Sequence, residues 1–247
     1  MSTSLAVLHV QGQPPAEVER ALTDIFVREE RPVVLRIEGT YSAVLERATD
    51  PDLDAAYRYL ILRPHPASAW TPVLELGNRT IDLDVELSRA LAGCSVVTTF
   101  VYGDVVSGYL VARAGAEIDR YTSDPTYFIP EAADGEEPAG ETALPLPAGV
   151  EDERGHPERF ADLLPPGTAP EDFARVVLRP GWWEERDAAA SGQPADAAED
   201  DLVDEGDRMR CIALAFELWG PDEYPFAADP GEVPNRVAGP AVALAFQ

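Results

Sequence analysis

The sequence predicts an α+β protein: a mostly antiparallel sheet with helices on one face, followed by a small helical region. Three observations lead to this fold class. Short β-branched segments alternate with amphipathic helical patterns in the first 129 residues. Three later strands are joined by connections too short for a parallel crossover. After residue 130 the composition changes to Pro, Gly, Ala and Glu, with few side chains able to fill a core.

The chain opens with a strand, a helix and a second strand. Residues 5–10 (LAVLHV) predict the first strand, and 33–37 (VVLRI) predict the second. Between them, Pro14 and Pro15 open a helix whose apolar residues recur with helical spacing on one face. These residues are Val18, Ala21, Leu22, Ile25 and Phe26.

The next elements are two strands and a second helix. Residues 57–63 (YRYLILR) and 72–76 (PVLEL) have the pattern of strands. A helix is expected over 82–91, where Leu83, Leu87 and Leu91 share one face. Its carboxylates at 82, 84 and 86 suit the positive end of a helix dipole better than a metal site.

A three-stranded meander follows. Its strands are predicted at 96–102, 107–113 and 117–121, with turns at Gly103-Asp104 and Ala114-Gly115. The short turns require antiparallel pairing.

We divide the chain into an α+β domain (1–129), an acidic linker or long loop (130–155) and a helical region (156–247) with an acidic insertion (187–207) and a Pro-rich tail. Phe160, Leu163 and Leu164 mark a first short helix, and Thr168-Ala169-Pro170-Glu171 resembles a capping box for a second. Residues 209–218 are apolar on all sides and predict a buried helix or strand. The final AVALAF predicts a returning edge strand.

The charge is strongly unbalanced. The chain has 45 acidic residues and 19 basic ones, all Arg, for a formal charge of −26. Either a GC-rich genome or a high-salt cytoplasm explains a Lys-free acidic chain, and we favour the first because residues 131–207 alone carry −17. Such a charge disfavours nucleic acid and anionic membranes, and it suits a basic protein partner.

Catalytic and cofactor signatures are absent from the sequence. It has no nucleophile-elbow, Walker A, dinucleotide-binding or HExxH pattern, and the stretch 199–207 fails the spacing of a calcium loop. The two cysteines, Cys94 and Cys211, form no redox or zinc motif and suit core packing. We therefore predict no catalytic residue, no metal ligand and no cofactor. Without a leader or a membrane-length apolar run, the expected location is the cytoplasm.

Candidate partner-binding residues are two tryptophans and a few acids. Adjacent Trp182 and Trp183 cannot both face one core in regular structure, and an exposed Trp is a typical interface hot spot. The alternative is that both are partly buried where a loop crosses the sheet. The acids assigned to this surface are Asp104, Glu199, Asp200 and Asp201.

The stretch from Trp70 to Phe128 resembles a group of uncharacterised bacterial proteins. The shared features are a Trp before a strand (WTPVLEL), an LSRAL helix, a VYGD strand end and a close of the form IDRYTSDPTYF. The later HPERFADLL resembles the helix that follows in that group. The resemblance covers about a third of the chain and implies no activity or site residue.

Three functional hypotheses follow. The preferred one is a non-enzymatic protein that binds a partner protein, with an immunity or antitoxin role as one form of it. The alternative is an enzyme of unfamiliar type with carboxylates such as Asp104 or Asp119 near the meander turns, which would have raised pKa values in a pocket. The third is an accessory subunit of a larger assembly, which predicts a large apolar patch.

Overall fold

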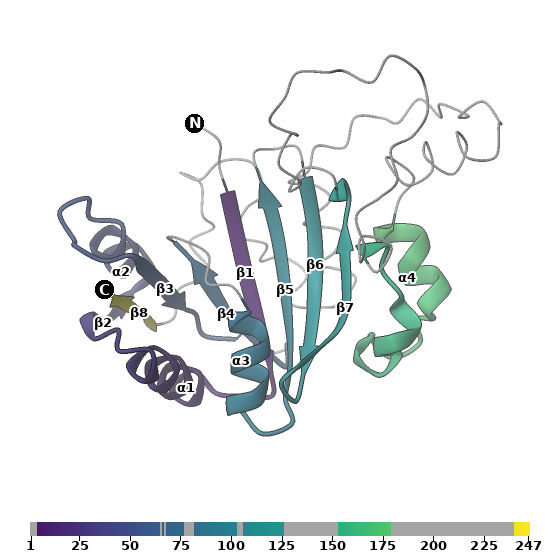
Figure 1. The fold of residues 1–247 in the computed structure, drawn as a ribbon, viewed down its shortest axis with the longest axis horizontal. Coiled ribbons are helices and arrows are strands. Elements are labelled where there is room, and N and C mark those ends of the chain that lie inside the picture. The colour runs from purple at the N-terminus through teal and green to yellow at the C-terminus, as the bar shows by residue number, and fades with distance from the viewer. Residues whose placement is uncertain are drawn as a thin grey trace, which may run out of the picture.

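The core of the molecule is one antiparallel sheet. A computed structural model describes residues 4–64, 66, 68–76, 82–102, 106–125, 153–178 and 240–247. Within them, eight strands form the sheet in the order β2-β8-β3-β4-β1-β5-β6-β7 (Figure 1). Every neighbouring pair is antiparallel, so the coarse prediction of an α+β fold with an antiparallel sheet is confirmed.

The described part of the chain forms strands and helices with the following bounds. The strands are β1 (Ser4–Gln11), β2 (Val33–Thr40), β3 (Tyr57–Ile61), β4 (Trp70–Glu75), β5 (Ser95–Tyr102), β6 (Val106–Arg113), β7 (Ala116–Thr122) and β8 (Pro240–Phe246). The helices are α1 (Pro15–Arg28), α2 (Tyr41–Ala48), α3 (Leu83–Ala90), the 3₁₀ helix η3 (Pro157–Leu163) and α4 (Pro170–Val177).

The patterned elements of the first 122 residues form as the sequence predicts. Helix α1 begins with Pro15 and buries the five apolar residues that its periodicity selected. The three meander strands β5, β6 and β7 pair in order, with Ala114-Gly115 in the turn between β6 and β7; the predicted turn at Gly103-Asp104 lies outside the described residues. Cys94 is buried, as its expected role in core packing requires, and Trp70 at the start of β4 is buried as well.

Helix α2 is an element that the sequence analysis did not predict. It follows β2 directly and has only eight residues, without a side-chain hydrogen bond at its N-cap, Thr40. Its buried residues Tyr41, Val44 and Ala48 pack over β8 and β2. A helix this short derives its stability from packing on the sheet, which local sequence signals do not report.

The last strand, β8, lies inside the sheet. We expected the C-terminal AVALAF at an edge, but β8 pairs with β2 on one side and with β3 on the other. Its side chains are buried on both faces, with Ala243 in one core and Leu244 in the other. A continuous apolar run is typical of a strand that is buried on both faces. The composition of this segment therefore indicated a place inside the sheet, whereas its place at the end of the sequence led us to expect an edge strand.

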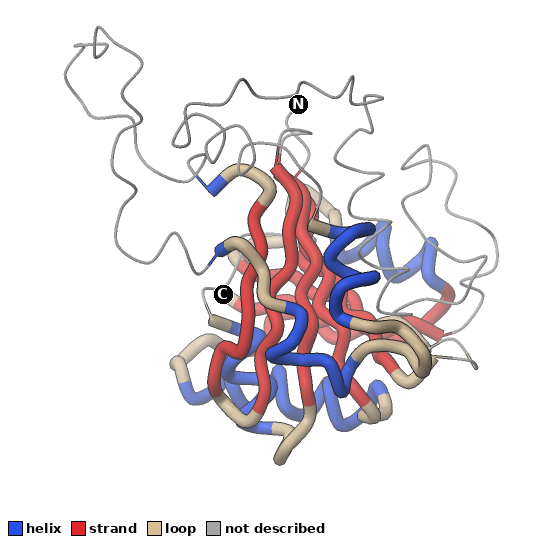
Figure 2. Tube along the Cα trace, turned by 90° about the vertical axis from the view of Figure 1, so that its right-hand side faces the viewer, coloured by secondary structure: helices blue, strands red, loops and turns tan. Residues whose placement is uncertain are grey.

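Helices cover both faces of the sheet, so the expectation of helices on one face is not confirmed (Figure 2). One core contains α1 and α3 with side chains such as Leu8, Tyr59 and Ile61. The opposite core contains α2, η3 and α4 with side chains such as Val7 and Leu60. Adjacent strand residues point to opposite faces, so this division follows the period of two within each strand.

Two short helices lie beside β6 and β7. Helix η3 contains the buried Phe160 and Leu163 that predicted it. Helix α4 begins at Pro170 with Ala169 as its N-cap, so Thr168 is not the cap that the motif suggested. The region predicted as linker (130–155) is described only from residue 153, where Arg154 bridges to Tyr121 of β7. The acidic insertion 187–207 and the apolar segment 209–218 lie outside the described residues.

Candidate functional site

A buried carboxylate, Asp119 on β7, lies at the centre of the most chemically distinctive cluster among the described residues. Strand β7 pairs with β6, and the register places Asp119 opposite Val111, with Tyr109 one step along the same face. The Asp119 side chain has no solvent exposure. Ionised carboxylates are rarely buried without partners, so its contacts decide what this cluster can do.

Four donor groups surround the two oxygens of Asp119. The Tyr109 hydroxyl donates to Oδ2 at 2.9 Å, and the backbone N–H of His156 donates to the same oxygen at 2.8 Å. The His156 ring nitrogen Nδ1 lies 3.3 Å from Oδ1, and Arg159 Nη1 lies 3.5 Å from it. Asp119 therefore joins the meander to the start of η3.

The electrostatics of the cluster follow from burial. Removal from water raises the pKa of Asp119, while the hydrogen bonds from His156 and Tyr109 and the charges of His156 and Arg159 act in the opposite direction. Burial and the neighbouring Asp119 charge raise the pKa of Tyr109 well above its usual value, so the phenol stays protonated and remains a donor.

Gly155 makes the close approach of this segment possible. Its φ of +77° is in the left-handed region, and an added Cβ would lie 2.7 Å from the Tyr109 hydroxyl and 2.8 Å from Leu178 Cδ2. Pro157 then starts η3, and His156 is its N-cap. The sequence Gly155-His156-Pro157 thus positions one imidazole beside a buried carboxylate.

The chemistry open to this arrangement is proton transfer. An imidazole whose Nδ1–H faces a carboxylate has Nε2 as its basic atom. The His156 side chain is 30% exposed and the Arg159 side chain 42% exposed, so a molecule from solvent can reach both. The wider network is structural: Arg113 of β6 donates to both oxygens of Asp162 on η3, at 3.0 and 2.9 Å.

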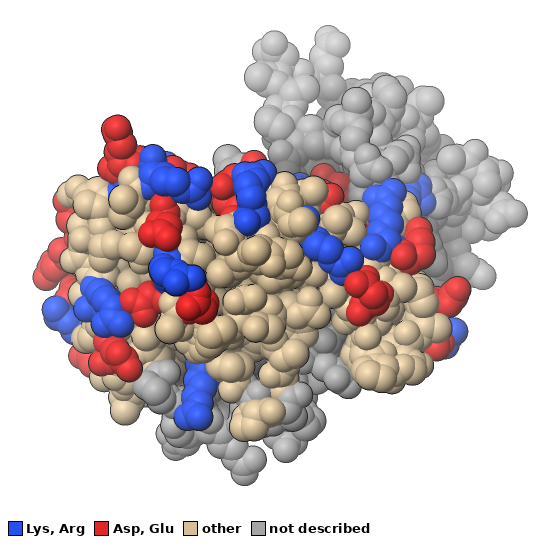
Figure 3. Space-filling model, turned by 90° about the horizontal axis from the view of Figure 1, so that it is seen from below, with Lys and Arg blue, Asp and Glu red and all other residues tan. Residues whose placement is uncertain are grey.

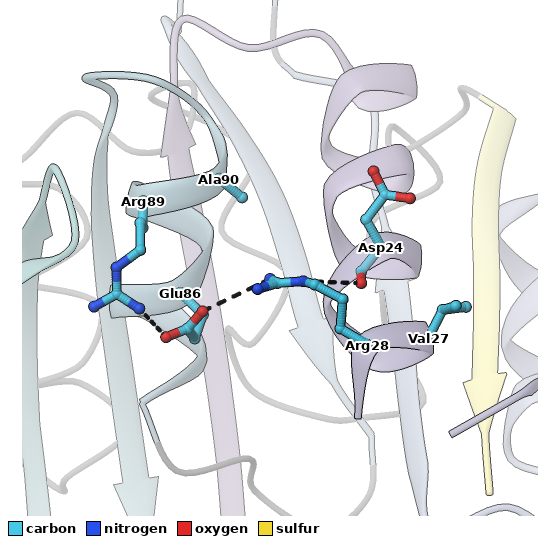
Figure 4. A pocket seen from close by; sticks show the side chains of 6 residues that line it. All are labelled: Asp24, Val27, Arg28, Glu86, Arg89 and Ala90. Carbon is cyan, nitrogen blue, oxygen red and sulfur yellow. Dashed lines mark hydrogen bonds and ion pairs between the residues drawn. The ribbon is translucent and has the colours of Figure 1, made fainter. Parts of the chain in front are cut away.

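A second surface feature is a shallow hollow between α1 and α3 (Figure 4). Glu86 of α3 lies between Arg89 of the same helix and Arg28 of α1, and pairs with both. The hollow is also lined by Asp24, so its two Arg and two acidic side chains sum to no net charge, and it has no charge surplus to attract an ionic ligand.

The partner-binding residues predicted from the sequence cannot be placed. Trp182, Trp183, Asp104, Glu199, Asp200 and Asp201 all lie outside the described residues. The acids Asp82, Asp84 and Glu86 do lie at the start of α3, where Asp84 accepts a hydrogen bond from Thr98 at 3.1 Å. No group of three or more potential metal ligands is found in the part of the chain that the structure describes.

Sequence reasoning named Asp119 as an alternative site residue but missed Tyr109, His156 and Arg159. His156 is 37 residues from Asp119 in the chain, and no local motif links them. The local signal was Gly-His-Pro before a short apolar helix. This pattern indicates a tight turn, but it does not indicate which distant residue the turn contacts.

Comparisons with known proteins add no assignment: no family model, no curated protein and no solved structure matches the chain. The resemblance of Trp70–Phe128 to a group of bacterial proteins therefore gains no support and transfers no residue role. Of the described helices, none has the length and apolar character needed to cross a membrane.

Proposed function

We propose that the chain is a non-enzymatic acidic protein that binds a basic protein partner, with an immunity or antitoxin role as one specific form. The observation that carries this proposal is the formal charge of −26. A field of this sign attracts cationic surfaces from a distance and repels nucleic acid and anionic lipid.

The distribution of charge supports this proposal. The described residues contain 13 Arg and 22 acids, a balance of −9, while the remaining residues carry −17. Most of the described Arg side chains are already in ion pairs, such as Arg47 with Asp50 and Arg175 with Asp172. On the face seen in Figure 3, basic and acidic side chains are accordingly intermixed.

The residues outside the described part carry the larger share of the net charge, and we infer that they attract the partner. They are concentrated in residues 131–152 and 184–207, next to Trp182 and Trp183 in the sequence. We propose that these two tryptophans supply the apolar anchor and that Asp104, Glu199, Asp200 and Asp201 add to the acidic surface. Charge would then set the rate and selectivity of association, while an aromatic anchor would set its lifetime.

The test is capture of the partner by the tagged chain, followed by titration of the purified pair. Trp182→Ala with Trp183→Ala, and separately deletion of 187–207, should each weaken binding. The matched control is Asp172→Asn on α4, an exposed acid in a local ion pair. A complex that survives both changes unaltered would exclude these residues as the binding surface.

A second candidate function, an acid–base enzyme, is favoured by one observation: a buried carboxylate of raised pKa beside a solvent-accessible imidazole. We would screen metabolites by thermal shift against the native chain and His156→Gln. A compound that stabilises only the native chain, and is consumed by it, would support the enzyme over the binding protein. Equal shifts for both chains would exclude His156 as a ligand-binding or catalytic group.

A further inference from the structure

Among the described residues, the outer edge of β2 is the uncovered end of the sheet. No described residue pairs with it, whereas the edge at β7 is bridged by Arg154 and packed by η3. The two nearby helices, α1 and α2, each contact both β2 and β8 and pack on opposite faces of the sheet, not along its edge. The large hydrophobic residues that are exposed in the described part of the chain are Val27 on α1 and Val33 and Val34, the first two residues of β2.

The pairing of β2 with β8 fixes which backbone groups point outward. Antiparallel neighbours alternate between pairs that exchange two hydrogen bonds and pairs that exchange none. Thr40 faces Pro240, which has no N–H, so this pair is of the second kind. Counting back from Thr40 along β2, the backbone N–H and C=O groups of Gly39 and Ile37 form hydrogen bonds with β8. The backbone groups of Arg36, Glu38 and Thr40 point outward, away from β8.

The side chains of β2 then select a single register for pairing with an identical strand. When two copies lie antiparallel about a two-fold axis at Ile37, Arg36 of each faces Glu38 of the other, and both are outward-bonding residues. An axis at Arg36 would place the two Arg36 side chains opposite each other. An axis at Glu38 would place the two Glu38 carboxylates opposite each other. Like charges directly opposite are destabilising. Axes at Leu35 or Gly39 would place Arg36 opposite Val34 or Glu38 opposite Thr40, so only the axis at Ile37 sets opposite charges face to face.

We propose that two copies of this chain associate edge to edge through β2, antiparallel, with the two-fold axis at Ile37. The sheet then continues across the dimer, and the Ile37 side chains meet where each is only partly covered by its own core. Arg36 already pairs with Glu19 of α1, through Nε at 2.5 Å and Nη2 at 3.2 Å, and its Nη2 lies 3.9 Å from Glu38 Oε2 of the same strand. In the dimer it lies between Glu19 and the second copy's Glu38. This association is independent of the proposed partner binding.

The first test measures mass in solution by light scattering during size-exclusion chromatography. The native chain of 26.7 kDa should elute as a dimer. Arg36→Glu and Glu38→Arg should each weaken dimerisation about tenfold or more, since each opposes like charges twice. An equimolar mixture of the two variants should regain the dimer mass, because each supplies the charges that the other lacks.

The matched control is Arg175→Glu, the same change on the exposed side of α4, which should leave the dimer intact. A native chain that is monomeric at every concentration would overturn the proposal. So would a dimer that is indifferent to both β2 variants, or one lost equally in the control. Pairing of β2 with an extended segment of another protein, on a monomeric chain, would also overturn it.

The register has its own test by oxidative cross-linking. In the proposed dimer Ile37 faces Ile37 as a pair without mutual hydrogen bonds, at a Cα separation compatible with a disulfide. Ile37→Cys should therefore give a covalent dimer, above the baseline set by the native cysteines. Arg36→Cys and Glu38→Cys should not exceed that baseline, and a stronger cross-link at either position would contradict the axis at Ile37.

Discussion

The two ends of the sheet differ in how they treat their outer strand. At one end no described residue pairs with the outer edge of β2, where Val33 and Val34 are exposed and Ile37 is only partly covered. At the other end β7 is bridged by Arg154, and its buried Asp119 binds groups from the start of η3. Exposed strand edges invite pairing, while covered edges do not. The comparison indicates that pairing with a second copy takes place at the β2 end, whereas the buried polar cluster around Asp119 lies at the β7 end.

The difference also separates the two kinds of stabilisation. Beneath β2, Phe26 stacks on Phe246 with ring centroids 4.2 Å apart, and the rings of Tyr57 and Tyr59 pack against it. Beneath β7, Tyr109 and Phe160 also pack edge to face, but the Tyr109 hydroxyl is bound to Asp119. Apolar burial is insensitive to pH, whereas a buried carboxylate depends on each of its donors.

The largest expected effect is at the apolar end. Phe26→Ala should lower the free energy of unfolding by about 3–5 kcal/mol, because it empties the volume of a fully buried ring. Urea unfolding followed by circular dichroism measures this. The neighbouring Val27→Ala, at a side chain that is 55% exposed, should change stability by less than about 0.5 kcal/mol. Equal costs at the two positions would contradict the packing of α1.

At the polar end, Asp119→Ala should cost about 2–3 kcal/mol, because it leaves the buried Tyr109 hydroxyl and the His156 N–H without their acceptor. A double-mutant cycle with Tyr109→Phe measures the coupling. The double variant should be less destabilised than the sum of the two single ones, by about 1 kcal/mol. Strict additivity would show that the hydroxyl and the carboxylate do not interact.

Between the two ends, His9 on β1 should make stability depend on pH. Burial lowers its pKa from 6.5 to about 3, so the folded state keeps the ring neutral while the unfolded chain takes up a proton below pH 6.5. This contribution is fully present above pH 6.5 and is lost as pH falls toward 3, at about 1.4 kcal/mol per pH unit. Compared with His9→Gln, the native chain should lose about 2 kcal/mol more between pH 7.5 and pH 5. Parallel pH profiles would place the titration elsewhere.

The smallest effect is expected at the surface of η3. Asp162→Ala removes the partner of Arg113 but only an exposed carboxylate, so it should cost about 0.5–1 kcal/mol, and less at high salt. Thermal unfolding at two salt concentrations checks this. A cost as large as that of Asp119→Ala would show that the two carboxylates, one exposed and one buried, are equivalent anchors of η3.

Much of the fold could be predicted because local patterns carry it. The buried face of α1 and the turns of the meander are set by residues within a few positions of one another. Helix α2 and the interior place of β8 could not be predicted in this way. The first depends on packing against distant strands, and the second on insertion of the last residues between two strands near the start of the chain.

The candidate site was predictable only in part. Asp119 follows a turn of the meander and was named as a possible site carboxylate, whereas its donors come from β6 and from a segment beyond residue 153. Contacts between side chains 37 positions apart leave no periodic signature. The Trp and acidic residues of the proposed binding surface were chosen by composition, and they stay predictions.

The most direct test of the proposed function is capture of partners from the native lysate by the tagged chain, at about 0.05 M and about 1 M KCl, read by mass spectrometry. The account predicts one stoichiometric basic protein that is retained at low salt and lost or strongly weakened at high salt. Absence of such a protein at both salt concentrations, or a partner that is acidic and indifferent to salt, would contradict it.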